Sequence, residues 1–253
     1  MRKYLLLAGA ALIGFSGSAY AAINCAVPPT CDELGYAYSA DWCKGQAILK
    51  CPFDQTKVFC GEPDNSVECQ IGSVLYDDLK CYDGEPFNGQ TAIAVVFDTS
   101  KRLAISISMF TNNIPWGGYG TDISGLDNCT DSNYTSCDTD GKSNTQKIVA
   151  ALGESSDYAA GLCYTLTHGG LPKGSWFLPS ASELKTLYNN KTKVHAGLAS
   201  LGSLYFPTSG WYWSSTEYSS NSALGLPLGT GSVGHTSKYY SNSYISARCA
   251  VAY

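Results

Sequence analysis

The sequence is poor in charge and has no basic segment. Only 15% of its 253 residues are charged, against about 25% in an average soluble domain. The net charge is −5, with no run of lysine or arginine, which argues against nucleic acid and against an anionic membrane surface as partners. Because 44% of the residues are hydrophobic and the mean hydropathy is −0.09, the composition excludes a disordered chain.

Metal-binding and catalytic patterns are also missing. No two cysteines are spaced as C-x-x-C, and His168, His195 and His235 lie far apart, so the sequence predicts no metal and no other cofactor. Beyond the first residues there is no G-x-S-x-G nucleophile elbow, and lone acids such as Asp122, Asp127 and Glu217 cannot be paired from the sequence in the way that a glycosidase requires. We therefore predict that the protein is not an enzyme.

The chain has one long apolar run, at its start. Arg2 and Lys3 precede apolar residues from Tyr4 to Phe15, and the small-residue pattern Ala19-Tyr20-Ala21 follows. These features are typical of a secretory signal peptide over residues 1–21. A run of roughly 12 apolar residues is shorter than the about 20 that span a bilayer, so we expect no membrane span. The predicted location is secreted, periplasmic or at the cell surface.

Cysteine, in contrast, is abundant. All 11 cysteines lie beyond residue 21, and in an oxidising compartment they indicate a disulfide framework. Residues 22–70 are predicted to form a small Cys-rich module, because a segment of this length needs cross-links in place of a core. Cys129 and Cys137 are expected to pair locally. The odd number leaves a thiol that is free or that links to another chain.

Residues 71–253 are predicted to form a second domain. Strands are expected over Ile71–Tyr76, Thr91–Phe97, Arg102–Ser108, Tyr212–Ser215 and Arg248–Val251. Helices are expected after the capping boxes Ser143-x-x-Gln146 and Ser180-x-x-Glu183, over Tyr158–Cys163 and around Val194–Leu201. Strands, then helices, then strands again predict an α+β fold with the terminal strands side by side. The Ser-, Gly- and Asn-rich segments between Tyr212–Ser215 and Arg248–Val251 are predicted to be exposed loops.

Three ordered motifs stand in this second domain, at Gly174–Leu184, Tyr212–Glu217 and Ala247–Val251. Together they resemble the signature W-x-L-P-S-x-x-E-L … Y-W-S-S-[ST]-E … V-R-x-V. This signature belongs to a bacterial family with a C-type lectin-like, formylglycine-generating-enzyme-like fold, similar to the C-terminal domains of collagen-like adhesins. The resemblance covers Ile71–Tyr253 and implies a C-type lectin-like domain. It departs at Ala223, which is followed by Leu224 where family members commonly have Trp.

The motif residues have simple structural interpretations. Trp176 and Trp213 are predicted to be core residues rather than ligand platforms. Glu183 is predicted to be a helix-cap partner rather than a general acid. Glu217 and Arg248 are expected to pair with each other or with the backbone.

The resemblance also suggests two activities that the residues do not support. Formylglycine-generating relatives use a redox pair of cysteines near the C-terminus, whereas Cys249 stands alone there, and a structural bond to Cys163 is the simpler interpretation. Calcium-dependent lectins carry E-P-N or Q-P-D together with W-N-D. Here Glu62-Pro63-Asp64 lies in the Cys-rich module, and W-N-D is absent.

The segment Tyr205–Tyr244 has the composition of a contact surface. Tyrosines stand among Ser, Gly and Asn, the residues with which antibody paratopes combine rigid contact area and adaptable hydrogen bonds. The candidate ligand-binding residues are Trp211, Tyr218, His235, Tyr239, Tyr240 and Tyr244. A Ser- and Tyr-rich surface without any ligand is the alternative. The fold that the motifs resemble also includes receptors whose loops are diversified by retroelements.

These observations predict an exported, adhesin- or receptor-like protein that binds a protein or glycan surface. The alternative is a structural subunit of a cell-surface appendage or envelope assembly. In that case the odd cysteine and the Cys-rich module would mediate self-association.

Overall fold

A computed structural model of the chain describes residues 46–50, 58–63, 66–84, 86, 90–108, 113–202, 210–239 and 245–253. The chain divides into two compact units, Met1–Asn65 and Ser66–Tyr253. In the first unit, β1 (Gln46–Lys50) and β2 (Val58–Pro63) form an antiparallel hairpin. The predicted signal peptide and Cys25, Cys31, Cys43 and Cys51 lie outside the described residues.

The second unit begins with a short cross-linked ribbon. β3 (Ser66–Val67) pairs with β5 (Cys81–Tyr82) in antiparallel register. The disulfide Cys69–Cys81 closes the same ribbon. The strand pairing and the disulfide connect residues 66–69 to residues 81–82. The second unit accordingly begins at Ser66, whereas the sequence predicted a start at Ile71.

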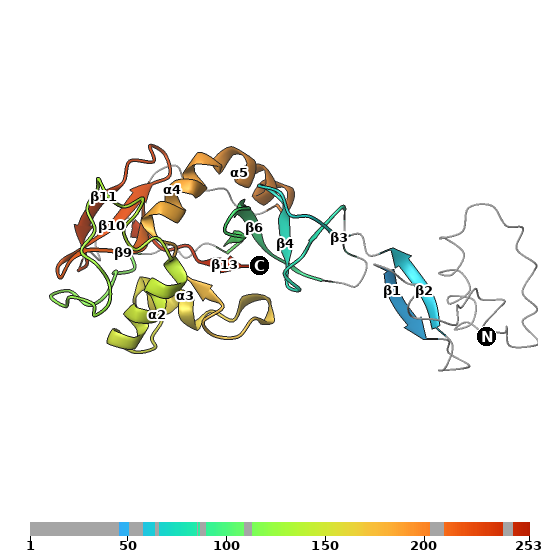
Figure 1. Ribbon diagram of the computed structural model, residues 1–253, viewed down its shortest axis with the longest axis horizontal. Helices are drawn as coiled ribbons and strands as arrows, with labels where there is room; N and C mark the ends of the chain where they lie inside the picture. The colour runs from blue at the N-terminus through green and yellow to red at the C-terminus, as the bar shows by residue number, and fades with distance from the viewer. Residues whose placement is uncertain are drawn as a thin grey trace, which may run out of the picture. The chain divides into compact units, whose positions relative to one another are not determined.

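Two larger sheets organise the second unit (Figure 1). The sheet we call central has the order β4-β6-β7-β13-β8, and the sheet we call outer has the order β11-β10-β9-β12. The central strands are β4 (Val74–Tyr76), β6 (Ala92–Asp98), β7 (Leu103–Ser106), β8 (Trp176–Phe177) and β13 (Ala250–Ala252). The outer strands are β9 (Trp211–Ser219), β10 (Ser222–Pro227), β11 (Gly234–Ser237) and β12 (Ile245–Ser246). Together with the helices, they confirm the predicted α+β class.

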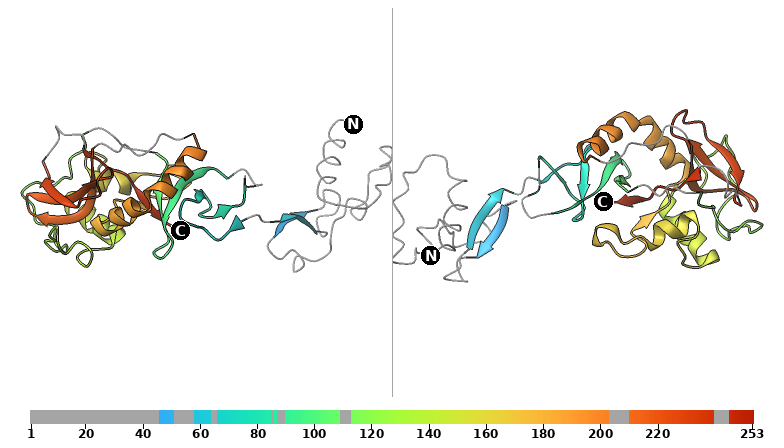
Figure 2. Two further views of the ribbon diagram at one scale, coloured as in Figure 1. Left: turned by 90° about the horizontal axis from the view of Figure 1, so that it is seen from above. Right: turned by 180° about the vertical axis from the view of Figure 1, so that it is seen from behind.

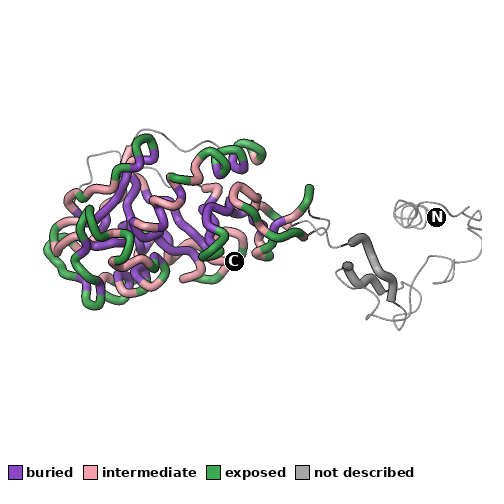
Figure 3. The backbone as a smooth tube through the Cα atoms, turned by 45° about the horizontal axis from the view of Figure 1, so that its top comes forward, coloured by how far each residue is buried: buried purple, intermediate pink, exposed green. Residues whose placement is uncertain are grey.

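The central sheet lies between two pairs of helices, as Figures 1 and 2 show. One pair is α2 (Gly141–Leu152) and α3 (Ala159–Thr165), and the other is α4 (Ala181–Asn189) and α5 (Lys191–Ser200). Strand β6 explains this arrangement because its side chains alternate between the two faces. Ala94 and Val96 pack with the α2 and α3 side chains, whereas Val95 and Phe97 pack with those of α4 and α5. Buried stretches of the backbone run through the interior of the second unit, and exposed stretches lie at its surface (Figure 3).

The last strand of the chain, β13, is an interior strand of the central sheet. β13 pairs antiparallel with β7 on one side and with β8 on the other, so the C-terminal strand does lie beside an early one. Cys249, directly before β13, is bonded to Cys163 of α3. Cys129 is bonded to Cys137, and both predicted disulfides are therefore confirmed.

Two local predictions need correction. The first helix begins before Ser143: Asp140 is its N-cap, and the Asp140 side chain accepts a 3.0 Å hydrogen bond from the Ser143 amide. The segment between Tyr212–Ser215 and Arg248–Val251 is not all exposed loop, because it contains β10 and β11. Within it, Leu224 and Leu226 are completely buried.

Candidate functional site

Two of the sequence motifs meet along β9. Its residues Ser214, Ser215, Thr216 and Glu217 are completely buried although all are polar. The Ser215 amide donates to the Pro179 carbonyl at 2.8 Å, and the Ala181 amide donates to the Thr216 hydroxyl at 2.9 Å. The buried polar residues of the second motif therefore hold the start of α4, which belongs to the first motif.

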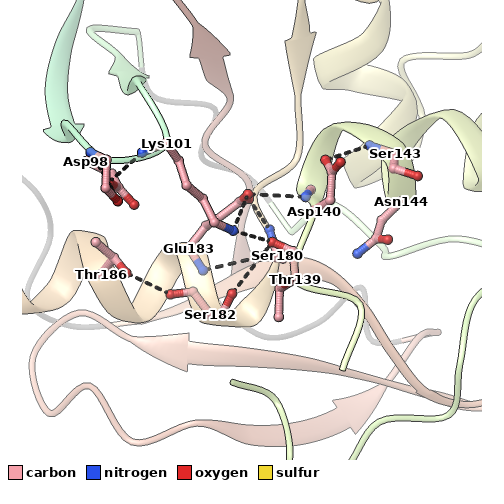
Figure 4. Close-up of polar contacts among 12 residues, drawn as sticks. Asp98, Lys101, Thr139, Asp140, Ser143, Asn144, Ser180, Ser182, Glu183 and Thr186 are labelled. Carbon is pink, nitrogen blue, oxygen red and sulfur yellow. Dashed lines mark hydrogen bonds and ion pairs between the residues drawn. The ribbon is translucent and has the colours of Figure 1, made fainter. Parts of the chain in front are cut away.

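Glu183 joins three segments (Figure 4). Its carboxylate accepts hydrogen bonds from the Ser180 amide at 2.9 Å and from the Gly141 amide at 3.3 Å, which caps the N-termini of both α4 and α2. The Lys101 ammonium, from the β6–β7 turn, lies 3.5 Å away. Burial raises the pKa of Glu183 above its usual range, although these contacts oppose the shift. The predicted role as a cap partner is confirmed by the capping box.

A second buried acid, Glu217, forms an ion pair with Lys238. Both side chains are fully shielded from solvent, and the Ile123 amide also donates to the Glu217 carboxylate, at 3.1 Å. The Lys238 ammonium donates to the Thr121 carbonyl at 2.8 Å and lies 4.5 Å from the centre of the Trp116 ring. Burial raises the pKa of Glu217, and the hydrogen bond from Lys238 opposes this.

Glu217 and Arg248 were expected to pair with each other or with the backbone, and the second alternative is confirmed: Glu217 accepts from the Ile123 amide and pairs in addition with Lys238. Arg248 is also buried, and its Nε donates to the Ser106 carbonyl at 2.9 Å. Trp176 and Trp213 are core residues, as predicted. Their indole nitrogens donate to the carbonyls of His168 and Ile114.

Two tyrosines stand exposed beside the buried ion pair. Tyr119 is 56% exposed and Tyr239 is 73% exposed, and their rings meet edge to face with centres 5.8 Å apart. We call these residues the tyrosine pair. Tyr239 directly follows Lys238, and Tyr119 lies just before Thr121, so the buried ammonium bridges the backbone segments that carry the two rings.

A second surface cluster contains Tyr218, His235 and Asp131. The Tyr218 and His235 rings are stacked, with centres 3.8 Å apart and planes 10° from parallel. The His235 Nδ1 lies 3.2 Å from the Asp131 carboxylate. The side chains of His235 and Asp131 are 40% and 45% exposed, so this cluster is also open to a ligand.

The structure separates the remaining candidate residues. Trp211 is half-buried, and its ring covers the strand glycines Gly225 and Gly234, which makes it a packing residue of the outer sheet. Tyr240 and Tyr244 lie outside the described residues. Of the six candidates, the structure thus brings Tyr218 and His235 together and places Tyr239 against Tyr119.

Three residues of these clusters were not predicted from the sequence: Tyr119, Asp131 and Lys238. Tyr119 lies in a Gly-rich stretch without periodicity, and Asp131 lies in the polar Cys129–Cys137 loop. The only usable signal was the pairing of Cys129 with Cys137, which fixes the loop that carries Asp131.

The described residues offer one group of potential metal ligands, Cys129, Cys137 and Asp138. The two sulfurs are bonded to each other, so neither is a thiolate that could bind a metal. Among the described residues, no helix has the length and the apolar content that a membrane span requires.

No family model matches the chain, and no curated protein matches it. Among solved structures it is similar to a fimbrial protein from Bacteroides ovatus ATCC 8483, with a TM-score of 0.50 and 14% sequence identity. The match covers 73% of this chain and 49% of that protein. The chain therefore corresponds to about half of the length of that fimbrial protein, and what the two share is a fold.

Proposed function

We propose that the protein is a structural subunit of a cell-surface appendage or envelope assembly. The observation that carries this proposal is the likeness of its fold to the fimbrial protein. The predicted signal peptide supports it, since an appendage subunit must be exported. The three disulfides of the second unit support it further, because such bonds persist in oxidising environments.

The cysteine count favours an assembly over a free monomer. The chain has 11 cysteines, and those of the second unit are paired as Cys69–Cys81, Cys129–Cys137 and Cys163–Cys249. The others are Cys25, Cys31, Cys43, Cys51 and Cys60, an odd number, all in the first unit. Because five is odd, at least one of these cysteines is free or is linked to another chain, and in an assembly it would bond to a neighbouring subunit.

The test is to locate the native protein on the bacterium that makes it. We expect immunogold labelling of extracellular material, and a sheared fraction that runs as a ladder on a non-reducing gel and collapses on reduction. Replacing Cys129 and Cys137 together by Ser is the matched control, since this intramolecular bond is not expected to affect the ladder. Recovery of the chain only as a monomer, inside the envelope or in the medium, would contradict the proposal.

A second role is favoured by the exposed tyrosine pair. Large aromatic side chains are enriched at binding surfaces, and Tyr119 and Tyr239 contact each other while both remain open to solvent. We propose that the second unit is a non-catalytic, C-type lectin-like domain that gives the assembly an adhesive surface. Adhesion of cells carrying Tyr239→Ala, compared with Val67→Ala cells, tests this role.

A further inference from the structure

We infer that the tyrosine pair, Tyr119 and Tyr239, is a platform for a neutral saccharide, an inference that rests on the adhesive role proposed above. In the described part of the chain, the exposed large hydrophobic residues are Val67 and these two tyrosines. Single exposed apolar side chains are ordinary on protein surfaces. Tyr119 and Tyr239 differ from such single side chains, because two exposed rings from distant segments contact each other and form one continuous aromatic surface.

The size of this surface favours a small ligand. A tyrosine side chain offers about 150–250 Å² of contact area, so residues that are 56% and 73% exposed present roughly 190–320 Å² together. A stable protein–protein interface needs about 800 Å² from each partner. Ser220 and the exposed Asn221, whose carbonyls bond the backbone next to the pair, are polar. The surface therefore fits one or two sugar rings better than a second protein.

Charge favours a neutral ligand. The cation nearest in sequence to the pair, Lys238, is fully buried and neutralised by Glu217. Asp122 is exposed, and its charge helps to raise the pKa of Glu217, which places it close to the ion pair. The negative charge of Asp122 would repel an anionic ligand at the pair.

The chemistry of the two rings matches a pyranose. One face of a sugar ring presents C–H groups with partial positive charge, and an aromatic face carries partial negative charge. The planes of Tyr119 and Tyr239 are inclined at 62°, so one ring can lie against the apolar sugar face while the other lies at its side. The two phenol hydroxyls can exchange hydrogen bonds with the hydroxyl groups at the rim of the sugar.

The platform is held in place before the ligand arrives. Next to Tyr119, the Gly120 amide donates to the Ser220 carbonyl at 3.0 Å, and next to Tyr239 the Lys238 amide donates to the Asn221 carbonyl at 2.9 Å. Both tyrosines are thereby fixed to the turn between β9 and β10. A rigid platform loses little conformational entropy on binding, and repetition of a weak site along an appendage would increase its avidity.

The test measures binding by the purified, exported full chain. Affinity electrophoresis in gels containing α-glucan, β-glucan, xylan or mannan, each with and without EDTA, is followed by calorimetry with the matching hexasaccharide. We expect at least one neutral glycan to bind, with the same Kd in EDTA. Tyr119→Ala and Tyr239→Ala should each raise Kd at least tenfold, whereas Tyr239→Phe should change it less than threefold. Val67→Ala, the other exposed apolar residue, should leave Kd unchanged.

Several results would overturn the inference. They are the absence of binding to all four neutral glycans, binding lost in EDTA, binding unaffected by either alanine variant, or binding to heparin or a protein array alone. Because the purified chain is used, these results do not depend on assembly. Failure of the proposed appendage role appears separately, as the absence of the chain from sheared extracellular material.

Discussion

The central and outer sheets of the second unit bury their inner strands by different means. In the central sheet, β6 and β7 are apolar apart from Asp98 and Ser106 at their ends, and their apolar side chains fill the cores on both faces. In the outer sheet, β9 buries the consecutive polar residues Ser214 to Glu217. Apolar burial is non-directional, whereas a buried polar group needs a partner at a defined place. We therefore expect a conservative apolar substitution in the central sheet to cost less stability than the loss of a polar partner in the outer sheet.

The aromatic residues of the two surface clusters lie around the outer sheet. Tyr218 lies on β9, His235 lies on β11, and Tyr239 follows β11. The loop that carries Tyr119 is bonded to the same sheet through Glu217, which accepts from the Ile123 amide. The buried polar residues therefore lie in the sheet to which the surface loops are bonded, and their hydrogen bonds hold those loops in position. The central sheet forms the apolar core beneath them.

The largest effect we expect is the loss of the cross-link that anchors the central sheet. Cys163 and Cys249 are 86 residues apart in the sequence, so the chain-entropy model gives about 4.6 kcal/mol for their bond. Cys129 and Cys137 are separated by 8 residues, and the same model gives about 2.5 kcal/mol. Urea unfolding of Cys163→Ala/Cys249→Ala and of Cys129→Ala/Cys137→Ala measures both. A larger loss for the local loop would contradict the chain-entropy explanation.

The next effect concerns the buried ion pair of the outer sheet. Lys238→Met leaves Glu217 buried without its cation, and the loss of one partner of a buried pair costs about 3–5 kcal/mol. Replacing both partners, with Glu217→Gln and Lys238→Met, should cost clearly less. In the central sheet, Ile105→Val at a fully buried position should cost about 0.5–1.5 kcal/mol. Equal losses for Lys238→Met and Ile105→Val would remove the distinction between the sheets.

Glu183 should give a smaller, pH-dependent effect. Burial raises the pKa of Glu183 in the folded protein above the usual value of a glutamate side chain, so the folded state binds the proton more tightly than the unfolded state. Stability from this group is therefore complete at low pH and falls as pH rises from about 4.5 through the folded pKa. The difference in unfolding free energy between the wild type and Glu183→Gln should fall over this window. A difference that stays constant or grows as pH rises through this window would contradict this explanation.

Much of the central sheet could be predicted from the sequence because its signals are local. The β6–β7 hairpin follows from two aliphatic runs around a polar turn, and the start of α4 follows from the capping box Ser180-x-x-Glu183. The Cys163–Cys249 bond could be predicted because cysteines are expected to form disulfides in an exported protein, and Cys249 is the last cysteine of the chain. Each of these features depends on neighbours in sequence or on simple pairing.

The outer sheet was harder to predict because its strands depend on partners far along the chain. β10 and β11 contain Ser, Gly and Pro, which have low strand propensity, and they form strands through pairing with β9 and with each other. Lys238 stands in a Ser- and Tyr-rich segment that has the pattern of a solvated surface. Its burial follows only from the tertiary contacts with Glu217 and Trp116.

The smallest effect should come from the tyrosine pair. Tyr119 and Tyr239 are more than half exposed, and substitutions at such positions usually change stability by about 0.5 kcal/mol or less. Tyr212→Ala, at a buried position of β9, is the matched control, because a buried aromatic replaced by alanine costs about 3–5 kcal/mol. Thermal unfolding of Tyr119→Ala and Tyr239→Ala should therefore overlay that of the wild type. If either variant instead loses as much stability as Tyr212→Ala, the pair belongs to the packing of the outer sheet, and the contrast between a rigid interior and a free binding surface fails.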